Sequence, residues 1–268
     1  MNEEQLSPGH VSIIMPAYNS ERYMTEAIDS VISQSYKDWD LTVIDDGSSD
    51  RTFETASEFA QEDNRITVQR NSVNRGVVYS RNRGIQAARG PWIAFLDSDD
   101  VWKQERLTDQ FELVREQNGA SFVFTGTAYV NEIGEMSAYT LRPPDRISFE
   151  DLLLHNPITC SSVLIKKELL KNDVAIHDGM HEDYAMWLSI LRDEPYAYAV
   201  PRPLTVHRMT SGSKSSNKIQ AARMNYRTLR HVGVGWLAAL SKMVQYATRN
   251  FRKYSAIYKG FIQESNES

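Results

Sequence analysis

Three carboxylates, those of Asp97, Asp99 and Asp100, directly follow the apolar segment 92–96. Carboxylates crowded at the end of a buried strand repel one another unless something positive lies between them. Together with a diphosphate, such carboxylates can hold Mg²⁺ or Mn²⁺, and the metal then stabilises a leaving nucleoside diphosphate. The simpler interpretation is a helix cap, in which Asp99 or Asp100 starts a helix near Lys103. On this tract alone, the cap is the stronger interpretation.

A second pair of acids, Asp45 and Asp46, ends the apolar segment 41–44 and precedes Gly47. A carboxylate at this point can accept a hydrogen bond from a base N–H or a ribose hydroxyl, although Asp-Gly is also a common turn pair. Three arginines, among them Arg81, lie near the start of an expected helix. Guanidinium groups and helix N-termini both favour phosphate, and a solvated basic face is the alternative.

A third pair, Glu182 and Asp183, lies at the head of an expected helix and is flanked by His177 and His181. Transfer of a group to a sugar hydroxyl requires a base that takes the hydroxyl proton, and a carboxylate aimed into a cleft can do so. The alternative is that both acids only complement the dipole of the first helical turn. Spacing alone favours this second interpretation.

The first half of the chain contains the elements that must position these groups. Apolar runs predict buried strands at 11–15, 41–44, 66–68 and 92–96, and helical periodicity predicts helices between them. We expect Asn19 or Ser20 to cap the first helix and Asp50 the second. This alternation predicts a parallel sheet with helices on both faces, which binds ligands at the carboxyl ends of its strands. The tracts 16–19, 45–48 and 97–100 should therefore meet at one edge.

The second half is less regular. The pattern predicts strands at 121–130 and 162–165, a short helix at 149–155 and a helix from about His181. A loop or hairpin is expected at 132–144. The polar, serine-rich segment 201–216 reads as a loop. From about 221 to 259 the pattern is helical and basic, and predicts one or two helices.

Composition limits the possible class of protein. The chain has 268 residues, of which 41% are hydrophobic and 24% charged, as is typical of a globular protein with one large domain and an appendage. Its single cysteine, Cys160, allows no intramolecular disulfide and fits a reducing compartment. We find no signal peptide and no apolar run of roughly 18 residues, so we expect a cytoplasmic protein.

Charge is distributed unevenly along the chain. The net charge is −5, yet residues 214–268 contain ten Lys and Arg against two acids. The acidic remainder argues against nucleic-acid binding. In the tail, Trp236, Leu240 and Val244 recur at helical spacing beside Arg249 and other basic residues, which predicts a helix lying on an anionic membrane surface. The alternatives are packing against the main domain, with a solvated basic side, and a dimer interface.

Together, these motifs resemble the family 2 glycosyltransferases, which have the GT-A fold. The resemblance rests on VSIIMPAYN at 11–19, SVISQS at 30–35, VIDDGSSD at 43–50, NRG at 74–76, RNRG at 81–84 and FLDSDD at 95–100. The HED tripeptide at 181–183, followed by Trp187, is similar to the family's Glu-Asp motif. The match is specific over most of 11–107 and looser as far as 215.

The resemblance implies an α/β fold of the GT-A (Rossmann-like) type, with a mostly parallel sheet flanked by helices and a C-terminal helical extension. The catalytic domain would span 1–215, with a nucleotide-binding half at about 11–107 and an acceptor half at about 108–215. A basic amphipathic helical tail would follow at 216–268. The implied activity is inverting transfer from a nucleotide diphosphate sugar, commonly a UDP-sugar, with Mn²⁺ or Mg²⁺.

The resemblance also assigns roles by motif position. The donor nucleotide and diphosphate would contact Pro16, Ala17, Tyr18, Asn19, Asp45, Asp46, Arg81, Asp97 and Ser98. Asp97 and Asp99 would form the family's Asp-x-Asp pair and hold the metal, with Asp99 the first candidate for its ligand. Asp183 would be the general base, and Glu182 its neighbour on the acceptor side.

One departure from the family pattern concerns a Tyr-Arg-x-His segment whose histidine can join the metal or diphosphate site. The matching stretch here has His207 in place of the tyrosine and Thr210 in place of the histidine. Either His207 serves the metal from a shifted position, or Asp99 and the diphosphate hold the metal alone.

Family members of this size often extend lipid-linked glycans of bacterial surface polysaccharides, such as O-antigen or capsule. The resemblance thus implies a nucleotide-sugar donor, a glycan or lipid-linked glycan acceptor, and a peripheral position on the cytoplasmic face of the inner membrane. Two other functions compete. A nucleotidyltransferase would carry a Gly-rich phosphate loop where the tract 16–19 stands. A non-catalytic nucleotide-sugar-binding protein is disfavoured by intact Asp97, Asp99 and Asp183.

Overall fold

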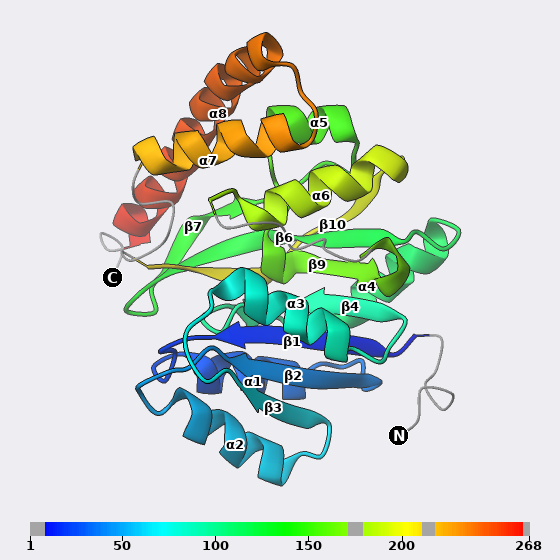
Figure 1. The fold of residues 1–268 in the computed structure, drawn as a ribbon, viewed down its shortest axis with the longest axis vertical. Coiled ribbons are helices and arrows are strands. Elements are labelled where there is room, and N and C mark those ends of the chain that lie inside the picture. The colour runs from blue at the N-terminus through cyan, green and yellow to red at the C-terminus, as the bar shows by residue number, and fades with distance from the viewer. Residues whose placement is uncertain (1–8, 171–178, 211–217, 265–268) are drawn as a thin grey trace.

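A computed structural model describes residues 9–170, 179–210 and 218–264, in which one twisted sheet lies between two layers of helices (Figure 1). The strand order is β3-β2-β1-β4-β9-β6-β10-β5, with β7 beside β6 and β8 beside β10. The strands are β1 (Val11–Ala17), β2 (Trp39–Asp45), β3 (Ile66–Arg70), β4 (Trp92–Phe95), β5 (Val101–Trp102), β6 (Phe122–Asn131), β7 (Met136–Leu141), β8 (Arg146–Ile147), β9 (Val163–Lys166) and β10 (Ala197–Met209). The helices are α1 (Met24–Ile32), α2 (Thr52–Glu62), α3 (Val77–Ala87), α4 (Arg106–Glu116), α5 (Phe149–Leu154), η2 (Cys160–Ser162), η3 (Lys167–Leu169), α6 (Glu182–Asp193), α7 (Lys218–His231) and α8 (Trp236–Glu264).

The parallel half of the sheet confirms the predicted alternation of strands and helices. β1 pairs in parallel with β2 and β4, and β2 in parallel with β3. All seven residues of β1 are buried, because helices cover both faces of the strand. Ile14 packs in the cluster beneath α3, α5 and α6, whereas Ile13 and Met15 pack beneath α1 and α4. The sheet therefore separates two hydrophobic cores.

The second half makes the sheet mixed. β9 pairs antiparallel with β4 and β6, and β10 pairs parallel with β6 but antiparallel with β5. β6 and β7 form the expected hairpin. Short antiparallel pairings connect the two parallel groups, so the strict parallel pattern ends at β4.

The prediction of a loop at 201–216 is wrong for residues 201–209, which belong to the long strand β10; residues 211–217 lie outside the described part. The polar, serine-rich composition suggested a loop, but Pro201 and Pro203 lie where the β10–β6 register shifts, between Val200 and Thr205. A bulge tolerates residues without a ladder donor, so the strand continues through both prolines.

The predicted cap of the first helix is also wrong. α1 begins at Met24 after Tyr23, with no side-chain cap, and neither Asn19 nor Ser20 caps it. Asn19 instead hydrogen-bonds to the loop that follows β2, and the Ser20 N–H donates to Thr52 Oγ1 at the start of α2. The N-cap of α2 is Arg51 rather than the predicted Asp50, although Asp50 accepts a hydrogen bond from the Thr52 N–H at 3.0 Å.

α3 lies unusually close to the sheet. A Cβ atom on Gly84 would come within 2.3 Å of Ile14 Cγ2, so only glycine permits this approach. Arg81 lies three residues before Gly84 and therefore on the same face of the helix, toward the sheet. This packing fixes Arg81 at the end of β4.

The tail forms two helices, α7 and α8, that pack on the main domain. The inner side of α8 lies along β7 and beside α5: Ser137 Oγ donates to the Ile257 carbonyl at 2.8 Å, and a Cβ on Gly260 would lie 2.2 Å from Ser137 Oγ. Within the described segments, no helix combines the length and apolar character that would be needed to cross a membrane.

Candidate active site

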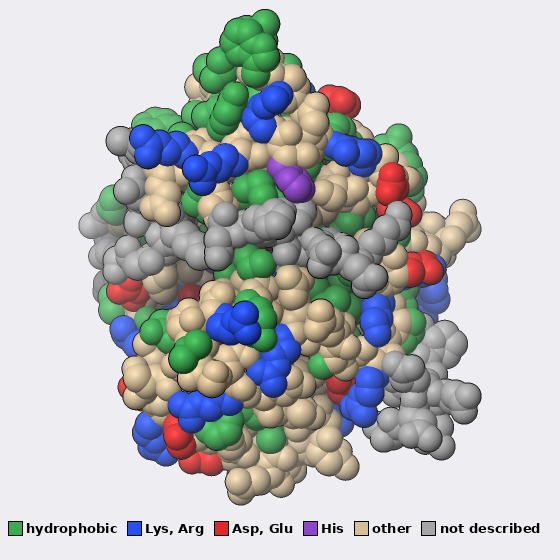
Figure 2. Space-filling model, viewed as in Figure 1, with side chains coloured by type: hydrophobic (Ala, Val, Ile, Leu, Met, Phe, Trp, Pro, Cys, Tyr) green, Lys and Arg blue, Asp and Glu red, His purple; other side chains and the backbone are tan. Residues whose placement is uncertain are grey.

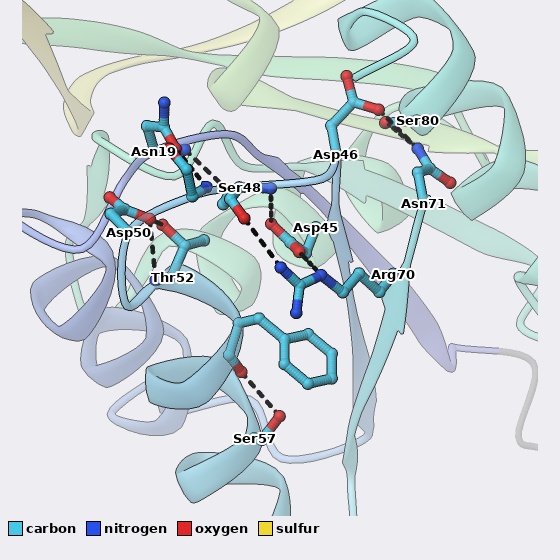
Figure 3. Close-up of polar contacts among 12 residues, drawn as sticks. Asn19, Asp45, Asp46, Ser48, Asp50, Thr52, Ser57, Arg70, Asn71 and Ser80 are labelled. Atoms are coloured by element: carbon cyan, nitrogen blue, oxygen red, sulfur yellow. Dashed lines mark hydrogen bonds and ion pairs between the residues drawn. The ribbon is translucent and has the colours of Figure 1, made fainter. Parts of the chain in front are cut away.

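Side-chain hydrogen bonds fasten the loops that follow β1 and β2 to each other (Figure 3). The Asn19 N–H donates to Ser48 Oγ at 2.9 Å, and Asn19 has a left-handed φ of 49°, which asparagine tolerates. Asp45 is fully buried: its carboxylate accepts from the Ser48 N–H at 3.1 Å and lies 3.0 Å from Arg70 Nε. Asn19 and Asp45 thus fix the shape of this corner.

Asp46 connects the same corner to the start of α3. Its carboxylate accepts hydrogen bonds from Asn71 Nδ2 at 2.6 Å, from the Arg75 N–H at 3.0 Å and from the Gly76 N–H at 2.7 Å. Gly76 has a φ of 88°, which favours glycine at this sharp entry to the helix. Asp46 therefore holds the helix that carries Arg81.

A pocket of about 330 Å³ opens at this edge of the sheet, within the size range of small-molecule sites. Its lining residues are Pro16, Tyr18, Asn19, Ser20, Tyr23, Val77, Asp97, Ser98, Asp99 and Thr210. Six of the predicted donor or metal residues thus face one space. The other four predicted nucleotide or diphosphate residues lie outside the lining; these are Ala17, Asp45, Asp46 and Arg81.

The acid tract, residues 97–100, does not cap a helix. β5 follows it directly, and α4 begins only at Arg106, so the cap interpretation is wrong. Burial raises the pKa of the Asp97 carboxyl. Burial, followed by repulsion from Asp100 and Asp97, raises the pKa of Asp99 to about 7. The tract therefore has an excess of negative charge that a cation at the pocket would relieve.

His207 lies behind the tract rather than in the pocket lining. Its Nδ1 is 3.0 Å from Asp100 Oδ1, and Asp100 also accepts from the Arg208 N–H at 3.0 Å. Burial opposes protonation of the His207 ring, but Asp100 beside it raises the pKa to about 9. His207 thus supports the fully buried Asp100, while Thr210 lines the pocket.

Arg81 joins the acid tract to the head of α6. Its Nη2 donates to Asp97 Oδ1 at 3.1 Å, and its Nη1 lies 3.9 Å from Glu182 Oε1. The guanidinium is only 3% exposed, and its Nε has no hydrogen-bond partner among the described residues. The N–H of Asp97 donates to Ser161 Oγ at 3.0 Å, which anchors the end of β4 to η2. Arg81 therefore brings the acid tract at 97–99 close to the pair at 182–183.

Asp183 follows Glu182 in the first turn of α6. Its Oδ1 accepts from the Tyr184 N–H at 2.7 Å. Burial and then Glu182 raise the pKa of Asp183, while Arg81 acts in the opposite direction. A carboxylate with a raised pKa is better suited to accept a proton near neutral pH.

Lys253 of α8, a charged residue that interacts electrostatically with Asp183, was not predicted as part of the site. The sequence contains a signal for it: Lys253 has the helical spacing of Tyr246 and Ile257, which face the main domain, and so interrupts an apolar stripe.

A family model and two similar proteins all identify the chain as similar to glycosyltransferases. The family model described as Glycosyl transferase family 2 matches residues 12–172. The chain is 32% identical over 244 residues to the putative teichuronic acid biosynthesis glycosyltransferase TuaG of Bacillus subtilis (strain 168), covering 91% of this chain and 96% of that protein. It is 33% identical over 250 residues to the UDP-Glc:alpha-D-GlcNAc-diphosphoundecaprenol beta-1,3-glucosyltransferase WfgD of Escherichia coli, covering 93% and 96%.

Solved structures show the same fold at low sequence identity. S. aureus TarS 1-349 in complex with UDP-GlcNAc has a TM-score of 0.69 at 19% identity, covering 91% of this chain and 73% of that chain. The mannosyltransferase PcManGT from Pyrobaculum calidifontis, in complex with GDP-Man and Mn²⁺, has a TM-score of 0.64 at 16% identity, covering 91% and 76%. The expected GT-A fold is confirmed.

Proposed function

The chain belongs to glycosyl transferase family 2, and from that premise we propose that it moves a sugar, with inversion, from a UDP-sugar to a hydroxyl of a lipid-linked glycan during synthesis of a bacterial surface polysaccharide. The names of WfgD and TuaG support the donor, the acceptor and the process. The observation that carries the proposal is the link through Arg81 between Asp97 at the pocket and Glu182 beside Asp183.

The pocket supplies the donor site. Pro16, Tyr18 and Asn19 form the side on which base and ribose lie, and Tyr18 is 49% exposed there, so its ring is free to contact a base. Ser98 and Asp97 face the diphosphate. We assign Ala17, Asp45 and Asp46 to the support of this side, because their contacts hold the two loops and α3. Arg81 Nε, which is unpaired among the described residues, suits the donor's negative charge.

Mn²⁺ or Mg²⁺ fits the acid tract, because Asp99 and Asp97 present oxygen ligands at a pocket with excess negative charge. Among the described residues, no group of three His, Cys, Asp or Glu side chains is arranged to hold a metal, so diphosphate oxygens would complete the coordination. When bound, the metal neutralises negative charge that develops on the leaving diphosphate. We assign His207 to the support of Asp100 beside these ligands.

The proposed reaction needs one proton acceptor. Asp183 takes the proton of the acceptor hydroxyl as the hydroxyl oxygen forms a bond to the anomeric carbon. The bond from that carbon to the diphosphate oxygen breaks, and its electron pair leaves with UDP. Attack from the face opposite the diphosphate gives inversion. Glu182, held by Arg81, keeps the start of α6 next to the donor.

A binding assay with two variants tests this function. Thermal unfolding is measured with UDP-, GDP- and dTDP-sugars, with and without Mn²⁺, because a ligand of the folded state raises its stability. We expect a metal-dependent shift with UDP-sugars that disappears in Asp99→Ala. Asp183→Asn should keep this shift and lose transfer by about 10²–10⁴-fold, the usual contribution of a general base. If no nucleotide sugar and no UDP shifts the folded wild type, the proposal is wrong.

We further propose that the outer stripe of α8 docks on the membrane that carries the acceptor. The stripe consists of exposed apolar side chains at helical spacing, namely Trp236, Leu237, Leu240, Val244, Phe251, Tyr258 and Ile262. Arg249, Arg252 and Lys259 are exposed on the same helix. Figure 2 shows hydrophobic side chains gathered at the tip of the molecule where α8 begins, with Lys and Arg side chains below them along α7. This combination suits an anionic lipid surface.

A further inference from the structure

The inner side of α8 borders the acceptor side of the site. Tyr246 stacks on Tyr184, the residue after Asp183, with 5.7 Å between ring centroids. About three turns later, Ile257 is fully buried and packs in the cluster of Tyr129. Lys253 lies seven residues after Tyr246 and four before Ile257, so helical geometry directs it to the same side.

Lys253 lies between the two groups of carboxylates. Its Nζ is 5.8 Å from the centre of the Tyr129 ring, and that ring meets the His207 ring at 6.1 Å. His207 in turn contacts Asp100, so only two side chains separate Lys253 from the acid tract. Burial lowers the pKa of Lys253 to about 8. The carboxylate of Asp183, on α6, partly opposes this shift.

Two further basic groups converge at this position. His155, the residue after α5, is half-buried, and burial followed by the charges of Lys253 and Arg249 lowers its pKa to about 4. Lys242 of α8 lies 3.5 Å from Glu150, whereas no carboxylate of the described residues lies within salt-bridge distance of Lys253. A half-buried ammonium without a direct counter-ion favours binding of an anion.

We propose that Lys253, flanked by His155 and Arg249, forms an anion subsite for the acceptor, which holds a diphosphate or a sugar carboxylate while Asp183 faces the reacting hydroxyl. This inference rests on the proposed function and deepens it. Arg81 contacts Asp97 at the pocket and approaches Glu182, whereas Lys253 lies on α8 beside the Tyr129 ring. In this proposal Arg81 serves the donor, Lys253 serves the acceptor, and the general base Asp183 acts between the two substrates.

Binding of three short amphiphiles tests the subsite in the full chain. The probes are decyl diphosphate, decyl glucuronide and neutral decyl glucoside, titrated calorimetrically into protein saturated with UDP and Mn²⁺ so that the donor site is filled. The variants are Lys253→Gln, the rescue variant Lys253→Arg, and the matched control Lys37→Gln, which removes an exposed lysine between α1 and β2, outside the surfaces proposed for α8.

We expect an anionic probe to bind about tenfold or more weakly to Lys253→Gln, with near-normal affinity for Lys253→Arg and Lys37→Gln. Loss confined to decyl diphosphate identifies a lipid diphosphate as the natural group, and loss confined to decyl glucuronide identifies an acidic sugar. An equal loss for neutral decyl glucoside, an equal loss in Lys37→Gln, or no loss for either anion overturns the subsite. UDP binding to each variant is measured separately: its absence from the wild type contradicts the proposed function, whereas its retention with unchanged anion binding contradicts only the subsite.

Discussion

At the scale of single residues, a few buried charged side chains hold the elements of the candidate active site together. Arg81 is the clearest example, because it contacts Asp97 on β4 and approaches Glu182 on α6, two elements far apart in sequence. The RNRG motif pointed to Arg81 as a phosphate contact. Its second contact, with Glu182, depends on how α6 returns to the sheet, and no spacing in the sequence reveals that.

Removal of the Arg81 charge should destabilise the protein strongly. Arg81→Gln leaves Asp97 and Glu182 without their shared cation, and loss of one partner of a buried pair costs about 3–5 kcal/mol; partial exposure of Asp97 places the expected loss at the lower end. Urea unfolding measures this loss. Arg51→Gln, at a mostly exposed arginine, is the control and should change stability by less than about 0.5 kcal/mol.

A double variant tests whether the loss of stability in Arg81→Gln comes from its pairing with Asp97. Because Asp97→Asn removes the carboxylate that Arg81 compensates, Arg81→Gln combined with Asp97→Asn should lose less than the sum of the two single losses. Strictly additive losses would show that the two side chains act independently, contrary to the geometry.

The contact between His207 and Asp100 predicts how stability depends on pH. The pKa of His207 is about 9 in the folded protein and about 6.5 in an unfolded chain, so the folded state binds the proton more tightly. The stabilisation is therefore complete below about pH 6.5 and is lost as pH rises through about 9.

Urea midpoints of the metal-free wild type and His207→Gln, compared near both ends of this pH window, measure the effect. The difference between the two proteins should be larger at the acidic end and smaller at the alkaline end. A difference that stays constant, or that grows with pH, would contradict a protonated His207 beside Asp100. Asp100→Asn should abolish the same pH dependence.

At the scale of elements, local patterns predicted the parallel half well, because each strand there is a short apolar run and each helix has one apolar stripe. β10 was missed because its prolines and polar side chains resemble a loop. In the sheet, those polar groups have partners: Thr205 Oγ1 contacts Thr125 Oγ1 at 3.0 Å, and Arg208 Nε donates to the Asp99 carbonyl at 3.0 Å. Such partners come from distant strands, and periodicity cannot show them.

The contact between α8 and β7 makes Gly260 a sensitive position. Gly260→Ala places a methyl group against Ser137 and the β7 backbone, which should cost about 1–3 kcal/mol as overpacking and loosen the helix from the domain. Thermal unfolding and hydrogen exchange of α8 measure this, while UDP binding should be unchanged.

Gly235→Ala is the matched control for Gly260→Ala. Gly235 directly precedes α8, and a Cβ there meets no atom within 4 Å, so stability and exchange should stay close to the wild type. If both alanine variants show the same stability and the same hydrogen exchange of α8, the close packing of α8 on β7 does not explain the glycine at position 260.

At the scale of the whole molecule, α8 has two different sides, one packed on the domain and one exposed. The sequence left packing, dimerisation and membrane binding open for the tail, because an amphipathic pattern does not identify what covers its apolar side. The structure shows that the side with Ala239, Tyr246 and Ile257 packs on the domain. The proposed membrane contact therefore concerns only the outer stripe.

Vesicle sedimentation tests the outer stripe. We expect the wild type to bind phosphatidylglycerol vesicles more tightly than phosphatidylcholine vesicles, and more weakly as salt screens the basic residues. Val244→Glu combined with Phe251→Glu should reduce this binding by at least about tenfold, since each buried apolar side chain contributes about 1.5–3 kcal/mol.

The control for this experiment is Val73→Glu, an exposed valine near the donor loops, which should sediment like the wild type. Equal binding by all three proteins would exclude the stripe as the membrane contact. Equal binding of the wild type to phosphatidylglycerol and phosphatidylcholine vesicles would contradict the role of the basic residues.

The position of α8 in chain order has a consequence for biosynthesis. The pocket lining comes from residues 16–99 together with Thr210, whereas Lys253 and Tyr246 belong to α8, which follows every other described element. Domains generally fold as units during translation, with N-terminal parts first. A ribosome thus releases most of the pocket lining well before α8, so under the proposed function a nascent chain would complete its donor side before its acceptor side.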